Sequence, residues 1–171
     1  MPSLLLLRHA KSSWSHPGLA DSDRPLADRG RKAAAAMAEE MVRRGWLPDH
    51  VLVSPSRRTR ETWAIIEARL DTAPEIRSLP ELYDASACGL LPILRTIPED
   101  AGTALVIGHN PGMAELAKGL SGAGSARTAL SVLKRKFPTA ALARFAIGGP
   151  WSELAHRHAR LTHFVRPKDL H

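Results

Sequence analysis

Two histidines hold equivalent places in the sequence, each just after a short apolar segment. His9 follows the run Leu4–Leu7 after a single arginine, and His109 follows Ala104–Ile107 after a single glycine. Histidine is the side chain best suited here to act as a nucleophile or to carry a proton near neutral pH. The pair therefore indicates either group transfer through an imidazole or two hydrogen-bonded structural histidines.

Arginines accompany the histidines. Arg8 directly precedes His9, and the pair Arg57-Arg58 follows a third apolar segment. A guanidinium group can bind two phosphate oxygens at once, and a helix N-terminus adds free N–H donors. Together these residues predict a pocket for an anion such as a phosphoryl group. The sequence has neither a Gly-x-x-x-x-Gly-Lys loop nor an aspartate-rich metal cluster, so it gives no support to nucleotide-loop or two-metal mechanisms.

Three apolar segments must form strands if these side chains are to meet. Met1–Leu7 is apolar at every position except Ser3, as strands are when both faces of a parallel sheet are covered. Ala104–Ile107 and His50–Val53 are expected to be strands of the same sheet. Open α/β sheets bind their ligands beyond the carboxyl ends of the strands. We therefore expect His9, His109 and the arginines at one edge of the sheet.

The other segments alternate between helix and strand patterns, which predicts an α/β layer fold. Ser54 can cap the helix after the second strand, and Pro55 suits its first position, so a helix is expected as far as about Leu70. A polar loop is expected over Lys11–Pro25. The remaining expected elements are helices over Ala27–Arg44, Ser86–Ile97 and Gly112–Leu120, and strands over Glu75–Ser78, Ala140–Ile147 and Arg160–Arg166.

Length, composition and charge limit the possible classes of protein. The chain has 171 residues, of which 44% are hydrophobic, so a disordered or fibrous protein is excluded. Lysine and arginine number 24 against 17 acidic residues, and the resulting charge of +7 favours anionic partners. Cys88 is the single cysteine, so neither an intrachain disulfide nor a cysteine-rich zinc cluster can form. The apolar runs are too short for a signal peptide or a membrane span, so we expect a cytoplasmic protein without a membrane partner.

Three motifs resemble those of the histidine phosphatase superfamily, also called the phosphoglycerate mutase-like superfamily. They are Leu7-Arg8-His9-Ala10, the run Ser-Pro-Ser-Arg-Arg at 54–58, and Gly108-His109-Asn110-Pro111. The sequence most resembles the branch of SixA-type phosphohistidine phosphatases, through residues 8–12, 23–26 and 136–141. The resemblance implies one domain over residues 1–171. It also implies a three-layer sandwich with a mostly parallel central sheet and helices on both faces.

The resemblance also implies a role for each residue of the predicted pocket. His9 is the implied nucleophile, which takes the phosphoryl group to form a phosphohistidine intermediate that water then hydrolyses. Arg8, Arg58 and His109 are the implied ligands of the phosphoryl oxygens, with no metal or other cofactor. Arg58 is preferred to Arg57 because of its offset from the Ser-Pro pair.

Two further residues leave alternatives open, and a third departs from the usual pattern of the family. Glu81, in the run Leu-Pro-Glu-Leu-Tyr, is either the general acid of the family or a solvated loop carboxylate. Arg24 either reaches the pocket from the polar loop or forms a surface ion pair. Ala10 stands where the family usually has glycine, which changes the backbone freedom beside the nucleophile.

The leaving group favours one class of substrate. An imidazole has a conjugate-acid pKa of roughly 6.5 and departs more easily than an alcohol, so a site without an assured acid suits phosphohistidine carried by a protein. A phosphatase for small phosphate esters remains an alternative. A second alternative is a non-enzymatic basic module that binds nucleic acid or a phosphoprotein, supported by the basic stretch from His156 to Lys168. Only 5% of the chain is aromatic, which argues against a nucleic-acid platform.

Overall fold

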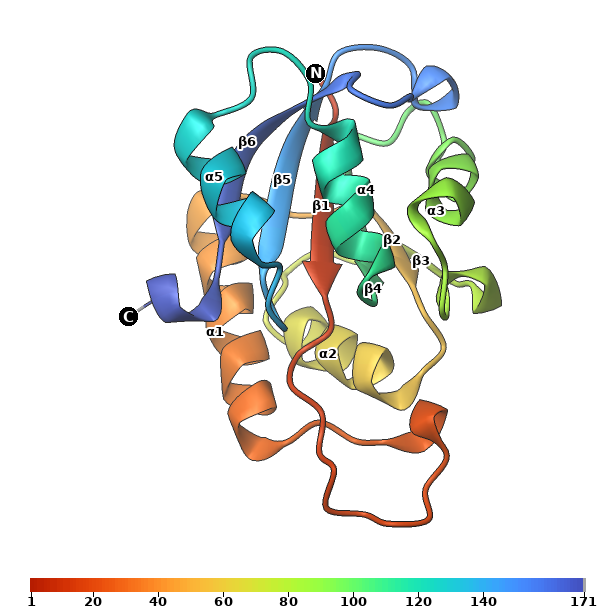
Figure 1. Cartoon of the computed structure of the whole chain (residues 1–171), viewed down its shortest axis with the longest axis vertical. Coiled ribbons are helices and arrows are strands. Elements are labelled where there is room, and N and C mark those ends of the chain that lie inside the picture. The colour runs from red at the N-terminus through yellow and green to blue at the C-terminus, as the bar shows by residue number, and fades with distance from the viewer. Residues whose placement is uncertain (171) are drawn as a thin grey trace.

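The apolar segments form the strands of one six-stranded sheet, seen in a computed structural model that describes residues 1–170 (Figure 1). The strand order is β3-β2-β4-β1-β5-β6. Strands β1 to β4 run parallel, β5 runs antiparallel to β1, and β6 runs antiparallel to β5. Five of the six strands thus point the same way, which confirms the mostly parallel sheet. The strands are Ser3–Arg8, His50–Val53, Glu75–Ser78, Thr103–Gly108, Leu142–Ile147 and Ala159–Val165, from β1 to β6.

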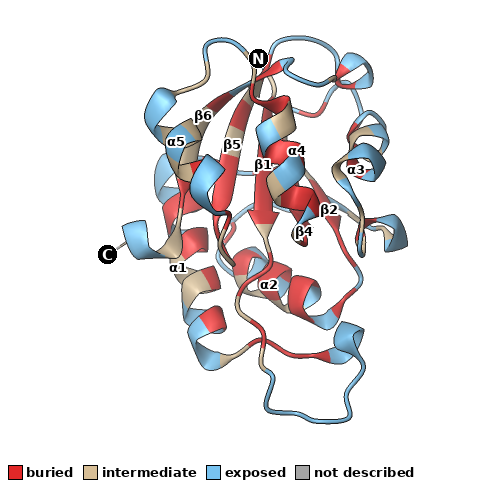
Figure 2. Ribbon diagram, viewed as in Figure 1, coloured by how far each residue is buried: buried red, intermediate tan, exposed pale blue. Residues whose placement is uncertain are grey.

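The leucines of β1 show why the central strands are apolar on both faces. Leu4 and Leu6 pack into one core, and Leu5 and Leu7 pack into another on the opposite face of the sheet. All four are fully or almost fully buried, as are most residues of the two strands beside β1 (Figure 2). A strand covered on both faces has no solvent-exposed position, so the run Leu4–Leu7 shows no alternation with polar residues.

Helices cover both faces of this sheet and complete three layers. Met37 of α1 and Trp63 of α2 join the core that contains Leu5 and Leu7. The other face is covered by α3, α4 and α5, which place apolar side chains against Leu4 and Leu6. This arrangement confirms the predicted α/β sandwich. The helices are Asp28–Arg44, Arg57–Glu67, Ala87–Leu94, Gly112–Leu120 and Arg127–Arg135, from α1 to α5. None of the helices within residues 1–170 is long and apolar enough to cross a membrane.

Two local features differ from the sequence-based expectation. The cap of α2 is Ser56, whose Oγ accepts a hydrogen bond from the Thr59 amide at 3.4 Å, so the prediction of Ser54 as the cap is wrong. Ser54 lies next to the end of β2, and its hydroxyl contacts His109 instead. Helix α5 was not expected; it follows a glycine-serine loop and buries Leu133 against the sheet.

Candidate active site

The carboxyl ends of three neighbouring strands bring the predicted residues together. Arg8 ends β1 and His9 follows it, His109 follows β4, and Arg58 lies in the first turn of α2 beyond β2. The rings of His9 and His109 lie 5.2 Å apart between centroids. Arg58 Nη2 lies 3.4 Å from His109 Nδ1. Since β2, β4 and β1 are adjacent in the sheet, residues distant in sequence form one cluster of two imidazoles and two guanidinium groups.

The environment of His9 leaves one ring nitrogen available for chemistry. Its Nδ1 lies 2.8 Å from the carbonyl oxygen of Ala10. A carbonyl can only accept a hydrogen bond, so Nδ1 carries the proton and Nε2 keeps its lone pair in the neutral ring. Burial, the neighbouring His109 and the two arginines lower the pKa of His9 to about 3, although its bond to Ala10 opposes the shift. His9 is therefore neutral at physiological pH and can act as a nucleophile.

His109 is held in the opposite tautomer. Its Nδ1 faces Arg58, which can only donate, so the neutral ring carries its proton on Nε2. That nitrogen donates to Ser54 Oγ at 2.8 Å. Burial and the charges of Arg58 and Arg8 lower the pKa of His109 to about 4, against the opposing charge of Asp21. An anion bound beside the ring would favour its cationic form, because an adjacent negative charge raises the pKa of an imidazole.

The two arginines have hydrogen-bonding capacity that the protein does not satisfy. The Nε–H groups of Arg8 and Arg58 are buried and have no partner within residues 1–170. Arg8 donates from Nη1 to the Phe137 carbonyl at 3.1 Å, and both burial and the charge of Arg58 lower the pKa of Arg8. Buried donors without partners are rare and destabilising. Like charges and unpaired donors at one point indicate a site built for an anion.

Arg57 and Arg58 point in different directions although they are neighbours. Arg58 is buried at the cluster, whereas Arg57 is exposed and donates from Nε to Glu61 Oε2 at 2.9 Å. Successive residues of a helix are about 100° apart, so only one of the two can face the site. The structure places Arg58 there.

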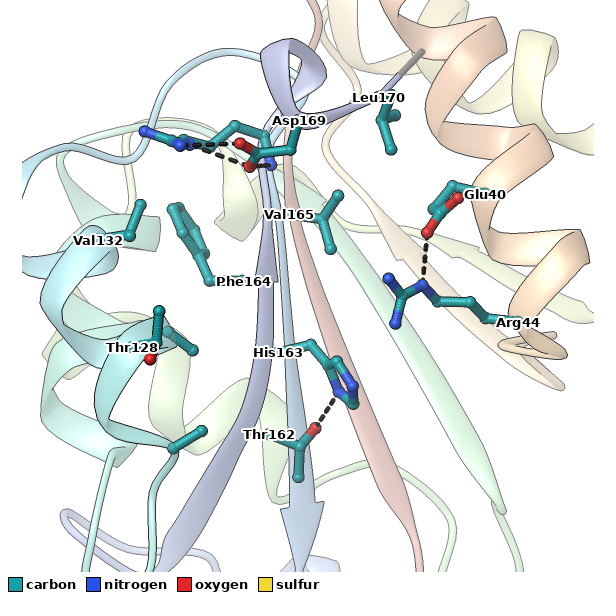
Figure 3. A pocket seen from close by; sticks show the side chains of 13 residues that line it. Glu40, Arg44, Thr128, Val132, Thr162, His163, Phe164, Val165, Asp169 and Leu170 are labelled. Carbon is teal, nitrogen blue, oxygen red and sulfur yellow. Dashed lines mark hydrogen bonds and ion pairs between the residues drawn. The ribbon is translucent and has the colours of Figure 1, made fainter.

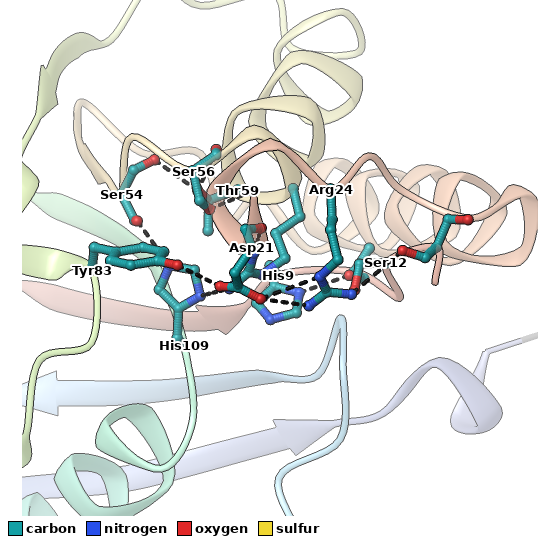
Figure 4. A network of polar contacts seen from close by, with 12 residues as sticks. His9, Ser12, Asp21, Arg24, Ser54, Ser56, Thr59, Tyr83 and His109 are labelled. Atoms are coloured by element: carbon teal, nitrogen blue, oxygen red, sulfur yellow. Dashed lines mark hydrogen bonds and ion pairs between the residues drawn. The ribbon is translucent and has the colours of Figure 1, made fainter. Parts of the chain in front are cut away.

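Asp21 is a residue of this site that the sequence analysis missed (Figure 4). Its carboxylate accepts from Arg58 Nη2 at 3.0 Å and from the Tyr83 hydroxyl, and its carbonyl accepts from Arg58 Nη1 at 2.8 Å. The hydrogen bond from Tyr83, followed by those of Arg58 and Arg24, lowers the pKa of Asp21 to about 2. The Tyr83 ring stands edge-on to His109, with 5.3 Å between centroids. An ionised Asp21 thus occupies donors of Arg58 that a phosphoryl group would also use.

The polar loop that carries Asp21 is fastened to the site by Arg24. This arginine is buried and donates from Nε to Asp21 Oδ1 at 3.2 Å and from Nη1 to Ser12 Oγ at 2.7 Å. Its guanidinium carbon lies 3.5 Å from the ring centroid of Trp14, which is 73% exposed. Arg24 therefore forms an ion pair and also lies at the site. The spacing of Asp21 and Arg24, three residues apart, is the only local signal that could have indicated this role.

Glu81 is exposed to solvent and forms no hydrogen bond or ion pair with the cluster among residues 1–170. It lies in the short helix Pro80–Leu82, two residues before Tyr83. Within residues 1–170 its carboxylate makes no hydrogen bond or ion pair. The assignment of Glu81 as the general acid stays a prediction. Among residues 1–170, no group of three or more His, Cys, Asp or Glu side chains is placed to hold a metal ion.

A cavity lies elsewhere, among α1, α5, β6 and the turn after β6 (Figure 3). It has a volume of about 410 Å³ and contains none of the predicted catalytic residues. Its charged side chains have partners. Arg44 pairs with Glu40 at 2.5 Å, Arg166 pairs with Asp169 at 2.8 Å, and His163 contacts the Thr162 hydroxyl at 3.0 Å.

Three residues of the cluster lie in a segment that matches a known protein family. Residues 4–87 match the model of the histidine phosphatase superfamily (branch 1), a segment that includes Arg8, His9 and Arg58. An uncharacterized chloroplastic protein of Arabidopsis thaliana is 36% identical over 157 residues, which cover 86% of this chain and 72% of that protein.

Solved structures extend the similarity to the whole fold. The putative phosphohistidine phosphatase SixA from Nakamurella multipartitia is 31% identical, with a TM-score of 0.83 over 97% of this chain and 96% of that chain. The putative phosphohistidine phosphatase SixA from Agrobacterium tumefaciens is 28% identical, with a TM-score of 0.80 over 98% of this chain and 99% of that chain. Both matches include the second half of the chain, where His109 lies.

Proposed function

The chain belongs to the histidine phosphatase superfamily, and from that premise we propose that it hydrolyses phosphohistidine carried by another protein, with His9 as the nucleophile. One observation carries the proposal. His9 keeps the lone pair of Nε2 in a neutral ring, beside two arginines whose buried Nε–H groups have no partner. A nucleophile and unsatisfied cationic donors at one point are what phosphoryl transfer requires, because that reaction depends mainly on positioning and on stabilising negative charge.

The reaction would take two steps. In the first, Nε2 of His9 attacks phosphorus, the P–N bond of the substrate breaks, and the departing imidazole leaves with a proton acquired from solvent. In the second, water attacks phosphorus, the P–Nε2 bond breaks, and inorganic phosphate is released with the oxygen of that water. One proton of the water passes to solvent, and His9 returns to its neutral form.

Arg8, Arg58 and His109 would hold the phosphoryl oxygens through both steps. Arg58 would exchange its bonds to Asp21 for bonds to phosphoryl oxygens, which are stronger competitors because of their greater charge. The incoming anion would also raise the pKa of His109, so that both of its ring nitrogens become donors. The proposed mechanism uses no metal ion.

The surroundings of the site support a protein substrate. Residues 14–23 of the loop beside the catalytic cluster are exposed, and Glu81 lies at the surface without bonds that would fix it as an acid. Imidazole is a good leaving group whose departure depends little on a general acid, whereas the departure of an alcohol depends on it more. A phosphatase for small phosphate esters is the second candidate, and it uses the same cluster.

Mass spectrometry after brief exposure to phosphoramidate or a phosphohistidine peptide tests the mechanism. We expect one phosphoryl group on His9, detected under alkaline conditions and absent from the His9→Ala protein. A phosphoryl group on any other residue, or turnover without a phosphoenzyme, would overturn the proposed mechanism. Comparison of kcat/KM for a phosphohistidine peptide with a panel of phosphorylated metabolites then separates the two candidate substrate classes, and a clear preference for a metabolite would favour the ester phosphatase.

A further inference from the structure

A groove lies next to the cluster of His9, His109, Arg8 and Arg58, and all of the charged residues that line it are cationic. Its volume is about 350 Å³. Four of the eight lining residues are cationic and none is acidic. The cations are Lys11, Arg29, Arg166 and Lys168, and the remaining wall consists of Ala33, Pro138, Thr139 and Pro167.

The groove opens at the same edge of the sheet as the catalytic residues. Lys11 comes two residues after His9, and Arg166 follows β6, which runs in the same direction as β1. The segment before β5 joins the two regions, since the Ala140 amide donates to the carbonyl oxygens of Arg8 and His9 at 3.0 and 3.1 Å. Strands β1 and β6 are separated by β5 alone, so these two strands, from whose ends His9 and Arg166 extend, lie about 10 Å apart.

The backbone fixes this groove in place. The Ala27 amide donates to the Lys11 carbonyl at 2.9 Å, and a Cβ atom at position 30 would lie 2.1 Å from the same oxygen. Gly30 therefore allows α1 to meet the chain that leaves His9. On the opposite wall, Asp169 accepts two hydrogen bonds from the Arg166 guanidinium, at 3.0 and 2.8 Å.

Three of the four cations are free to bind a partner. Lys11, Arg29 and Lys168 form no ion pair with any residue from 1 to 170, whereas Arg166 is paired with Asp169. Arg29 and Lys168 are exposed. A concave surface lined by charge of one sign attracts groups of the opposite sign and accelerates their association.

We propose that this groove docks an acidic segment of the protein that carries the phosphohistidine. The proposal rests on the proposed function and adds the chemistry of the partner. An acidic polypeptide fits better than a nucleic acid because no aromatic ring lines the groove, and single-stranded nucleic acids depend on stacking with such rings. The separation of about 10 Å corresponds to roughly three residues of an extended chain, so the acidic residues would begin about three positions from the phosphohistidine.

Two synthetic peptides test this inference. Both carry one phosphohistidine; the first has glutamates three to six residues away on both sides, and the second has glutamines there. The enzymes are the wild type, the double variant Arg29→Glu/Lys168→Glu, and the control Lys118→Glu/Arg127→Glu. The control makes the same change in charge at exposed residues of α4 and α5. Circular dichroism establishes that all three proteins are folded.

We expect the wild type to prefer the glutamate peptide, and the groove variant to lose about tenfold in kcat/KM for that peptide through KM. Hydrolysis of the glutamine peptide and of phosphoramidate should change less than about twofold in the groove variant. The control variant should change less than about twofold with every substrate. Equal turnover of the two peptides by the wild type, or equal losses in the two variants, would overturn the inference while leaving the proposed function intact.

Binding of the unphosphorylated glutamate peptide, measured by fluorescence anisotropy, separates docking from catalysis. The groove variant should bind this peptide about tenfold more weakly than the control does. If no substrate is hydrolysed but this difference remains, the proposed function fails, and the groove is left as a binding site for an acidic segment of a partner that is not a phosphohistidine substrate. Equal binding of this peptide by the groove variant and the control would overturn the inference that the groove docks an acidic segment. Tighter binding of a single-stranded oligonucleotide of equal charge than of the peptide, lost in the same variant, would also overturn it in favour of a nucleic-acid partner.

Discussion

The cluster of His9, His109, Arg8 and Arg58 and the cavity of Figure 3 both place histidine beside arginine, yet they differ in whether the arginines have hydrogen-bond partners. In the cavity, burial and the nearby Arg44 and Arg144 lower the pKa of His163, much as burial and arginines do for His9. Arg44 and Arg144 have partners of their own, however, whereas the Nε–H groups of Arg8 and Arg58 do not. A lowered histidine pKa or a cavity is therefore a weaker sign of an anion site than buried cationic donors without partners.

The largest expected effect is a difference in activity between variants of His9, in the cluster, and His163, at the cavity. His9→Ala should reduce hydrolysis by on the order of 10⁴-fold, because it removes the nucleophile on which both steps depend. His163→Ala should leave turnover within about twofold, because His163 lies at the cavity, away from the cluster. Steady-state kinetics of the two folded variants provides the measurement. A His9→Ala protein with near-normal turnover would show that the cluster is not the catalytic centre.

Arg57 and Arg58 allow a comparison between an exposed arginine that pairs with Glu61 and a buried arginine whose Nε–H has no partner among residues 1–170. Arg58→Ala should lower kcat/KM by about 10³-fold, because two charge-assisted hydrogen bonds of roughly 1.5–3 kcal/mol each are lost. Arg57→Ala should have less than about a twofold effect, since Arg57 is exposed and paired with Glu61. Equal damage from the two substitutions, measured on the same substrate, would mean that the phosphate-binding arginine is misassigned.

Glu81→Gln should distinguish the two substrate classes. Hydrolysis of an aryl or alkyl phosphate ester should fall by about 10²-fold if Glu81 protonates the departing oxygen, within the usual range for general acids. Hydrolysis of a phosphohistidine peptide should fall much less, because imidazole can leave already protonated. Both substrates should be measured at one pH. A similar large loss for both would assign Glu81 to the structure of the pocket, and no loss for either would leave it a loop carboxylate.

The pH dependence of stability should reflect the buried histidines. The folded-state pKa values are about 3 for His9 and about 4 for His109, below the usual 6.5 of the unfolded chain. Between these pKa values the unfolded state binds more protons than the folded state. The contribution of the two histidines to the free energy of unfolding is therefore fully present above pH 6.5 and decreases as the pH drops towards 4. Urea denaturation from pH 7 to pH 4 should show a smaller loss for His9→Gln and His109→Gln than for the wild type. An unchanged slope in both variants would mean that neither ring is held neutral by burial.

The smallest expected effect is that of metal removal. Activity should change less than about twofold in excess chelator, because the cluster consists of histidines and arginines, and arginine is not a metal ligand. The measurement is phosphoramidate hydrolysis before and after dialysis against chelator. Loss of activity that one divalent ion restores would contradict the mechanism.

The parts of the site that lie at strand ends were predictable from the sequence. His9 and His109 follow apolar segments directly, and the rule that parallel strands deliver their loops to one edge then brings them together. Asp21 and Tyr83 were not predictable in this way, because their contacts depend on a long loop that returns to α2. The distinction between Ser54 and Ser56 also depended on tertiary structure, since either serine could cap a helix and only the position of His109 decides between them.

The hydrogen bond between His9 Nδ1 and the Ala10 carbonyl has a consequence for regiochemistry. Phosphohistidine exists as two isomers, pros with phosphorus on Nδ1 and tele with phosphorus on Nε2. Because the protonated Nδ1 is engaged by the main chain, the proposed intermediate is the tele isomer alone. The pros form would require the loss of that hydrogen bond within a buried site. Phosphorus NMR of the trapped phosphoenzyme, compared with both synthetic isomers, should therefore show a single tele resonance.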